Sequence, residues 1–257
     1  MKFVKKFEEV SKKDILLVGG KATSLGEMTN AGISIPSGLV ITTRAYEEIR
    51  KSIPTEVEKE ILEAFDSLKT KRVAVRSSAI AEDSLTSSWA GQLESYLNVT
   101  REKLIDNIRK CWNSIKSERA LAYAADQNLP KNKLLVAVVV QKMIDSKISG
   151  VIFTANPITN NLQEIMIESG LGLGESLVSG MITPDNFIVD KKTLAIKNKT
   201  IQTNKTTLSD GQIKDLANLS LQIEKYFHAP QDIEWAIDKN NKVWILQSRP
   251  ITTLSEV

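Results

Sequence analysis

Apolar residues along this chain recur at two spacings, one typical of β-strands and one typical of amphipathic α-helices. Residues 134–143 form a nearly unbroken apolar run rich in β-branched side chains, which predicts a central strand. Two further strands are predicted at residues 149–154 and 164–168. One amphipathic helix is predicted over residues 213–227. Another shows helical spacing at Leu104, Ile108, Cys111, Trp112 and Ile115.

Helical patterns are concentrated in the first part of the chain and strand patterns in the second. A helix interrupted near Pro54 is predicted over residues 45–68, whereas the part after residue 132 is rich in predicted strands. We therefore expect a boundary between two lobes near residues 100–132.

Composition is that of an ordinary soluble globular protein, with 42% hydrophobic and 25% charged residues among 257. The net charge of +3, from 34 basic and 31 acidic residues, argues against nucleic-acid binding through bulk charge. The longest apolar run is too short to span a bilayer, and the N-terminus lacks the apolar segment of a signal peptide. The single cysteine, Cys111, rules out an intramolecular disulfide, so a reducing cytoplasm is the expected location.

A short predicted strand at residues 73–75 leads into a stretch of small hydroxyl and acidic residues around Arg76. The stretch closes on a second run of small side chains at residues 89–92. Arginine supplies a permanent charge and forked donors, and small residues let backbone N–H groups approach a phosphate. The pattern therefore predicts an anion clamp; the alternative is a surface loop with one solvated arginine.

A double glycine precedes Lys21 and a helical pattern, which predicts a loop that enters a helix at its N-terminus. Backbone donors, the helix dipole and a lysine would then converge on an anion. The segment is no Walker A loop, because Ile15 stands where that pattern needs glycine and Ala22 where it needs serine or threonine. The alternative is a glycine turn with an exposed lysine.

Gln141 is the polar residue that interrupts the apolar run at residues 134–143. A buried amide at the end of a strand needs a hydrogen-bond partner. The base of a bound nucleotide and the neighbouring backbone are the two alternatives for that partner.

The end of the chain predicts a β-hairpin, because polar and apolar residues alternate over 232–238 and in part over 243–249 around a Lys-Asn-Asn-Lys turn. A two-residue or a four-residue loop pairs Glu234 with Gln247 and Asp232 with Arg249. Opposed residues project from the same face of a hairpin. A loop of odd length would break this register.

A carboxylate beside an amide oxygen suits Mg²⁺, which prefers oxygen ligands and is commonly completed by nucleotide phosphates and water. Glu234 and Gln247 are therefore candidate metal ligands, and the adjacent Arg249 is a candidate phosphate ligand. The alternative is a solvated face with a surface ion pair worth about 0–1 kcal/mol.

Together these segments resemble the ATP-binding domain shared by phosphoenolpyruvate synthase, pyruvate phosphate dikinase and rifampicin phosphotransferase. The resemblance covers nearly the whole chain, and the ordered set of motifs is far more specific than any single one. Its motifs lie at residues 19–28, 75–79, 82–83, 90–92, 172–175, 232–235 and 247–250.

The resemblance implies an α+β ATP-grasp fold, in which two lobes, expected at residues 1–100 and 101–257, clamp Mg·ATP. It also implies roles for individual residues. Phosphates would be held by Lys21, Arg76 and Arg249, which are the candidate catalytic residues. The nucleotide would also be bound by Gly91, Ser95 and Gln141, and Mg²⁺ by Glu234 and Gln247.

Two departures from the family pattern bear on function. The segment between Lys21 and Arg76, and residues 191–209, look shorter than in the family. In relatives a swivelling domain with a phospho-accepting histidine follows, and then an acceptor-substrate domain; we expect both on another chain or a missing segment. The single histidine, His228, lacks the family's catalytic histidine motif and is expected to be structural.

The leading hypothesis is therefore an ATP-dependent phosphotransferase module that donates a phosphoryl or pyrophosphoryl group to a histidine elsewhere. The second is a nucleotide-binding or regulatory module without turnover. A stand-alone small-molecule kinase would need an acceptor pocket and a base that the sequence does not offer.

Overall fold

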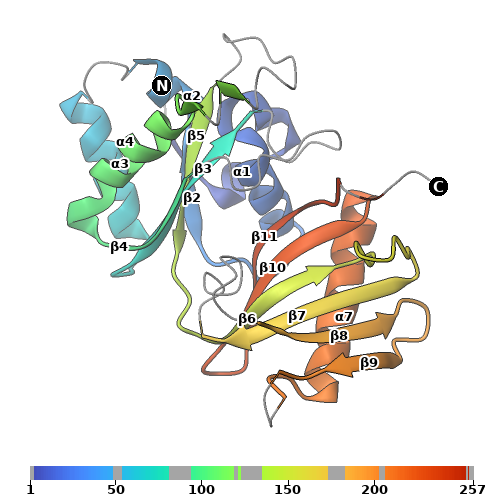
Figure 1. Cartoon of the computed structure of the whole chain (residues 1–257). Helices are drawn as coiled ribbons and strands as arrows, with labels where there is room; N and C mark the ends of the chain where they lie inside the picture. Colours follow the sequence, from blue (N-terminus) through green and yellow to red (C-terminus); the bar gives the residue numbers. More distant parts are fainter. Residues whose placement is uncertain are drawn as a thin grey trace. The chain divides into compact units, whose positions relative to one another are not determined.

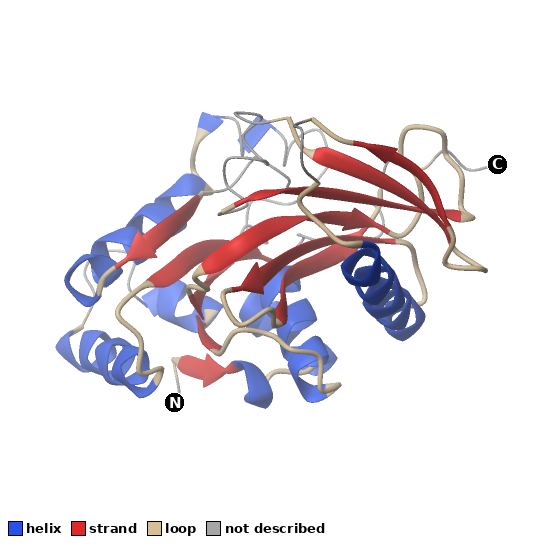
Figure 2. Cartoon of the chain, turned by 90° about the horizontal axis from the view of Figure 1, so that it is seen from below, coloured by secondary structure: helices blue, strands red, loops and turns tan. Residues whose placement is uncertain are grey.

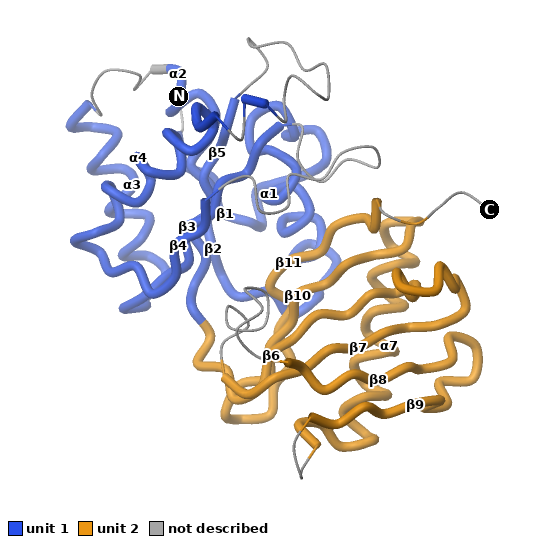
Figure 3. The backbone as a smooth tube through the Cα atoms, in the orientation of Figure 1, with its two compact units in different colours: residues 1–143 blue, residues 144–257 orange. Residues whose placement is uncertain are grey.

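The computed structural model describes residues 3–48, 54–80, 94–118, 121–122, 135–172, 183–202, 206–252 and 254. The chain divides into two compact units, residues 1–143 (unit 1) and 144–257 (unit 2) (Figure 3). This division falls later than residue 100, where the sequence analysis separated the lobes. The difference arises because the chain between residues 101 and 143 supplies a helix and a strand that pack within unit 1.

Unit 1 is built on a five-stranded antiparallel sheet in the order β1-β2-β5-β3-β4. The strands are β1 (Val4–Lys6), β2 (Gly38–Ile41), β3 (Val73–Ala79), β4 (Ser95–Val99) and β5 (Val136–Lys142). β5 lies in the middle of the sheet, and its residues 136–141 are all buried. The predicted central strand is therefore confirmed, and its continuous apolar sequence follows from burial on both faces.

Helices cover both faces of this sheet. The helices of unit 1 include α1 (Ile15–Asn30), α2 (Thr43–Glu48), α3 (Thr55–Ser67) and α4 (Leu104–Ser114), with the short 3-10 helices η1 (Phe7–Glu9), η2 (Lys12–Asp14) and η3 (Arg101–Lys103). α3 and α4 lie on one side of the sheet and α1 on the other (Figure 1). Val75 and Val138 of the sheet pack with Ile61 and Ile108 in one apolar cluster. The helical spacing over residues 104–115 is thus confirmed as a core-facing helix.

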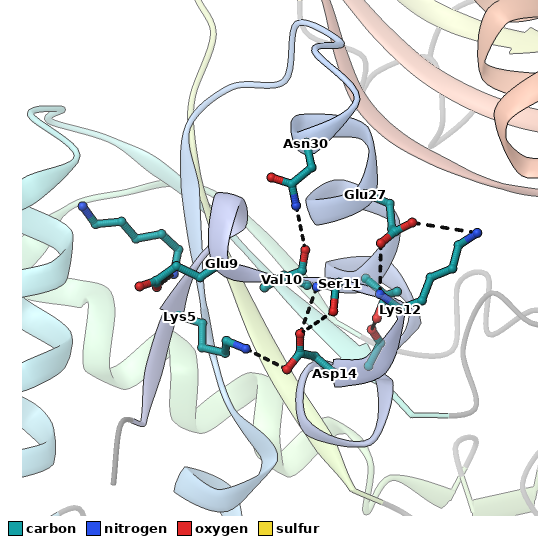
Figure 4. A network of polar contacts seen from close by, with 11 residues as sticks. Lys5, Glu9, Val10, Ser11, Lys12, Asp14, Glu27 and Asn30 are labelled. Carbon is teal, nitrogen blue, oxygen red and sulfur yellow. Dashed lines mark hydrogen bonds and ion pairs between the residues drawn. The ribbon is translucent and has the colours of Figure 1, made fainter.

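The segment before α1 is tied to that helix by polar contacts (Figure 4). The Lys12 amide donates to Glu27 Oε1 at 3.0 Å, and Asn30 Nδ2 donates to the Val10 carbonyl at 3.0 Å. A Cβ added at Gly26 would lie 2.6 Å from Val10 Cβ, so the backbone of α1 approaches this segment closely. These contacts fix the C-terminal half of α1 against η1 and η2.

Unit 2 is a six-stranded antiparallel sheet in the order β11-β10-β6-β7-β8-β9. Its strands are β6 (Ser146–Phe153), β7 (Glu164–Leu171), β8 (Asp185–Asp190), β9 (Ile196–Thr200), β10 (Gln231–Asp238) and β11 (Val243–Pro250). Together with unit 1, this confirms the predicted α+β class.

One face of the unit 2 sheet is covered by α7 (Asp210–Phe227), as Figures 1 and 2 show. Ser209 caps the helix and forms a capping box with Gln212, and Ile213, Leu216 and Ile223 are buried. The predicted amphipathic helix is therefore confirmed. Across the described residues, neither α7 nor any other helix is long and apolar enough to cross a bilayer.

The hairpin of β10 and β11 pairs Glu234 with Gln247 and Asp232 with Arg249, as predicted, but for a different reason. Near the turn Ile237 pairs with Val243, so the connecting loop has an odd number of residues. The sequence analysis expected such a loop to break the pairing of Glu234 with Gln247. A β-bulge then places Leu246 as an extra residue in β11, since Glu234 pairs with Gln247 and Trp235 with Ile245. The bulge restores the predicted pairs.

Candidate functional site

The glycine turn lies inside α1, where Gly19 (φ +76°) separates two helical segments. A Cβ at Gly19 would lie 2.3 Å from the Ser78 carbonyl oxygen, so this position excludes a side chain as well as requiring a left-handed backbone. Ser78 Oγ donates to the Val18 carbonyl at 2.8 Å and accepts from the Ala22 amide at 3.1 Å. Strand β3 therefore holds the start of the second helical segment, where the predicted anion site lies.

Lys21 is buried directly after this turn. Its Nζ donates to the Ser77 carbonyl oxygen at 3.0 Å, which fixes the ammonium group beside β3. The predicted alternative of an exposed lysine is therefore wrong. Lys21 thus stands at the start of the second helical segment, where the predicted anion site lies.

Arg76, Ser95 and Gln141 project from the same face of the unit 1 sheet. Arg76 pairs with Ser95 of β4, and Gln141 of β5 pairs with Ala74, two residues before Arg76. Val75, between them, points into the cluster under α3 and α4, so these three side chains project toward the face that α1 covers. The predicted unit 1 residues thus lie together around β3, except Gly91, which lies outside the described residues.

Gln141 is only 2% exposed, and its Nε2 has no hydrogen-bond partner among the described residues. An unsatisfied buried amide costs about 1–3 kcal/mol. The contrast is Gln231, also buried, whose amide donates to the Ala229 carbonyl and accepts from Ser248 Oγ. The sequence analysis left two alternatives for the partner of Gln141, the base of a nucleotide and the neighbouring backbone. The neighbouring backbone does not accept a hydrogen bond from Gln141 Nε2 in the described structure.

In unit 2, Glu234 and Gln247 lie directly opposite each other on the face away from α7. Trp235 and Ile245 are buried on the other face. In a regular strand Gln247 and Ile245 would share a face, because side chains alternate. The bulge at Leu246 turns Gln247 to the side of Glu234, and bulges of this kind are common beside functional sites.

Asp232 holds Arg249 on the same face. Its Oδ2 accepts from Arg249 Nε at 2.8 Å and from Nη2 at 2.6 Å, and both side chains are mostly buried. Burial raises the pKa of Asp232 above its usual range; Arg249 opposes this change and Glu234 adds to it. The arginine is therefore kept in one orientation next to the Glu234–Gln247 pair.

The sequence analysis missed Glu168, which lies in the same row of this face. Glu234 pairs with Val151, Val151 with Glu168, and Glu168 with Asn186. Burial raises the pKa of Glu168, a hydrogen bond with Asn186 opposes the change, and repulsion from Asp232 adds to it. The sequence does show an acid, Glu168, at the end of the apolar run at residues 164–168. The face of the sheet from which its side chain projects depends on pairing with other strands, so the sequence alone did not place it.

The donor set of Glu234 and Gln247 fits Mg²⁺, because a carboxylate and an amide oxygen stand side by side and Mg²⁺ uses few protein ligands beside phosphates and water. Within the described ranges there is no group of three or more His, Cys, Asp or Glu residues that could enclose a metal ion. The geometry therefore suits a metal that arrives with a phosphate ligand.

The sequence also singled out Cys111 and His228, which lie in the core of unit 1 and at the end of α7. Burial raises the pKa of the Cys111 thiol to about 12, so the thiol stays protonated in the core. His228 is the C-cap of α7 and has a left-handed backbone (φ +56°).

The family described as pyruvate phosphate dikinase, AMP/ATP-binding domain, matches residues 15–52 and 49–257 of the chain. The two matches meet at residues 49–52, between Lys21 and Arg76, and a segment there that is shorter than in the family stays a prediction. Shortening at residues 191–209 stays a prediction.

Curated relatives extend across the chain. A probable phosphoenolpyruvate synthase from Pyrococcus horikoshii is 37% identical over 361 aligned residues, covering 99% of this chain and 44% of the relative. A rifampicin phosphotransferase from Bacillus cereus is 37% identical over 313, covering 98% of this chain and 36% of the relative. The chain thus spans less than half the length of these relatives.

Solved structures resemble the chain at low identity. A D-alanine-D-alanine ligase from Coxiella burnetii has a TM-score of 0.43 and 12% identity, covering 92% of this chain and 49% of that one. The ATP-grasp ligase PsnB has a TM-score of 0.40 and 8% identity, covering 95% and 54%.

Proposed function

Because this chain belongs to the family of the pyruvate phosphate dikinase AMP/ATP-binding domain, we propose that it binds Mg·ATP and donates a phosphoryl or pyrophosphoryl group to a histidine. The histidine would belong to a swivelling domain outside these 257 residues, and an acceptor-substrate domain would receive the group from it. The chain's relatives are more than twice its length, which supports further domains on the same or another polypeptide.

The observation that carries this proposal is the arrangement of side chains on the face of β10 and β11 away from α7. Glu234 and Gln247 stand opposite each other, and one step along the hairpin Asp232 fixes Arg249. Glu234 and Gln247 would hold Mg²⁺, and Arg249 would contact a phosphate of the nucleotide. A purely structural ion pair would explain Asp232 and Arg249 but not a bulge that turns a buried amide toward a carboxylate.

Unit 1 would supply the remaining nucleotide contacts. Lys21, fixed by Ser77, and Arg76 would hold phosphate oxygens, and Gly91 and Ser95 would line the nucleotide. Gln141 would satisfy its Nε2 on the adenine base. Phosphoryl transfer needs chiefly positioning and electrostatic stabilisation, so fixed cations of this kind are the expected machinery. Mg²⁺, when bound, would neutralise charge on the phosphate oxygens.

Thermal unfolding with and without Mg·ATP tests the binding step. At a ligand concentration of 100 times Kd, ATP should add about 2.7 kcal/mol to the free energy of unfolding of the wild type. Glu234→Gln should lose most of this gain, whereas Asp215→Asn, an exposed carboxylate on α7, should retain it. An equal gain in all three proteins would contradict the assignment of Glu234.

The alternative is a nucleotide-binding module without turnover. The products formed from ATP distinguish it from a phosphotransferase. Incubation with ATP and a histidine-bearing acceptor should yield AMP or ADP and a labelled histidine if the chain is a phosphotransferase. Stabilisation by Mg·ATP without either product would favour the regulatory module.

A further inference from the structure

The connection between β6 and β7, residues 154–163, exposes two large aliphatic side chains. Ile158 is 77% exposed and Leu162 is 46% exposed. Residues 154–163, which we call the Ile158 hairpin, contain no charged side chain, although a quarter of the whole chain is charged. Exposed apolar groups that gather in one uncharged segment are typical of interaction sites.

The Ile158 hairpin is held in one conformation by its own hydrogen bonds. Asn156 is buried; its Oδ1 accepts from the amides of Ile158 at 3.0 Å and Thr159 at 3.3 Å, and its Nδ2 donates to Glu164 at 3.0 Å. The Asn156 amide donates to the Asn161 carbonyl at 3.0 Å. Ile158 is thus presented on an ordered turn, which lowers the entropy cost of docking a partner there.

The hairpin lies at the phosphate-binding end of the proposed site in unit 2. Phe153, the last residue of β6, pairs with Asp232, which holds Arg249. The Thr154 amide donates to the Gln231 carbonyl at 2.9 Å, and the Gln231 amide donates back to Thr154 Oγ1 at 2.8 Å. The connection is therefore anchored directly to the start of β10, next to the residue that positions Arg249.

We propose that the Ile158 hairpin is the docking surface for the histidine-bearing domain that accepts the group from ATP. This inference rests on the proposed function. Ile158 and Leu162 would pack on an uncharged apolar patch beside the acceptor histidine. The partner comes from outside these 257 residues, in keeping with relatives of which the chain covers 27–47%.

Position and chemistry both favour this occupant over others. The acceptor nitrogen must approach the reacting phosphorus to about 3–3.5 Å, so its domain must touch the surface around Arg249. The partner must also leave after transfer, when its histidine carries a phosphoryl group of about −1.5 to −2 charge. A small uncharged contact binds both forms without depending on that charge.

The test uses full-length Bacillus cereus rifampicin phosphotransferase as the acceptor, in a variant whose own ATP-binding domain no longer binds ATP. Any label on its histidine therefore comes from this chain. Labelling is measured with [β-³²P]ATP and [γ-³²P]ATP over a range of acceptor concentrations, for the wild type, Ile158→Asp and Leu162→Asp. Leu171→Asp is the matched control, because Leu171 is 70% exposed but lies at the opposite end of β7.

We expect Ile158→Asp to lower kcat/KM for the acceptor at least tenfold, mainly through KM, with Mg·ATP affinity and Tm unchanged. Leu162→Asp should have a smaller effect, and Leu171→Asp should stay within twofold of the wild type. Labelling by Ile158→Asp and Leu162→Asp at the wild-type rate would overturn the docking surface and leave the proposed function intact. No labelling by the wild type would overturn the proposed transfer and this inference with it. Ile158→Ser serves as the second variant if the aspartate lowers Tm.

Discussion

The two groups of candidate residues are positioned in opposite ways. In unit 1, Lys21 is fixed by Ser77, 56 residues away, and the glycine turn before it is fitted against Ser78. In unit 2, Asp232 and Arg249 are 17 residues apart on one hairpin. The first group depends on long-range packing and the second on local strand register. Changes that disturb the long-range packing around Lys21 should therefore cost stability and binding together, whereas loss of the Asp232–Arg249 contact should cost function with little loss of stability.

The largest effect is expected for Gly19→Ala. The new Cβ would combine a left-handed backbone with a 2.3 Å approach to the Ser78 carbonyl, so we expect a loss of about 3 kcal/mol or more in the free energy of unfolding. Gly32→Ala is the matched control, because Gly32 has φ +79° but nothing within 4 Å of the added Cβ. It should cost only about 1 kcal/mol. Urea denaturation measures both; equal losses would contradict the close packing of the turn.

The reverse pattern is expected for Asp232→Asn. Loss of the carboxylate should leave Arg249 poorly oriented and lower the rate of label transfer about 100-fold, which is the size of the loss when one preorganised contact to a developing charge is removed. The free energy of unfolding should change by only about 1 kcal/mol, because asparagine keeps an acceptor for Arg249. Transfer and urea denaturation are measured on the same samples. A large loss of stability would show that this pair is structural.

Gln141→Leu separates binding from stability inside unit 1. Removal of a buried amide whose Nε2 lacks a partner in the described structure should leave the free energy of unfolding unchanged or raise it by about 1 kcal/mol. Mg·ATP affinity, measured by calorimetry, should fall about tenfold, or about 1.4 kcal/mol. Gln231→Leu is the control, because it breaks satisfied hydrogen bonds and should destabilise without affecting affinity directly. Unchanged affinity in Gln141→Leu would remove Gln141 from the nucleotide site.

The smallest effect concerns Glu168 and pH. Because burial raises the pKa of Glu168, the folded state binds more protons than the unfolded state above the ordinary glutamate pKa of about 4.3. The contribution of Glu168 to stability is therefore present below that pH and is lost as pH rises through the raised pKa. Glu168→Gln should flatten the decline of stability with rising pH in this window. Unfolding curves from pH 4 to 7 measure the difference; parallel curves would contradict a buried acid at this position.

The contrast between long-range packing in unit 1 and local strand register in unit 2 also explains which features could be predicted from the sequence. The pairing of Glu234 with Gln247 was predicted from the turn, but the turn itself sets a register one residue away, and the pair forms only because of the bulge. The bulge at Leu246 was not predictable, because it is decided by packing of Ile245 and Trp235 under the sheet. Family motifs identified Lys21 and Arg76, but the contact of Lys21 with Ser77 depends on how α1 packs on β3. Glu168 and Ile158 were missed, since the face of Glu168 follows from pairing across several strands and the exposure of Ile158 from the turn that Asn156 holds.

The most direct test of the account is a crystal structure of the chain with Mg²⁺ and a non-hydrolysable ATP analogue. The account predicts a carboxylate oxygen of Glu234 and the amide oxygen of Gln247 at about 2.0–2.1 Å from Mg²⁺, with Arg249 on a phosphate oxygen and Gln141 on the base. A nucleotide bound away from β10 and β11, or a Mg²⁺ ion held by other side chains, would contradict it.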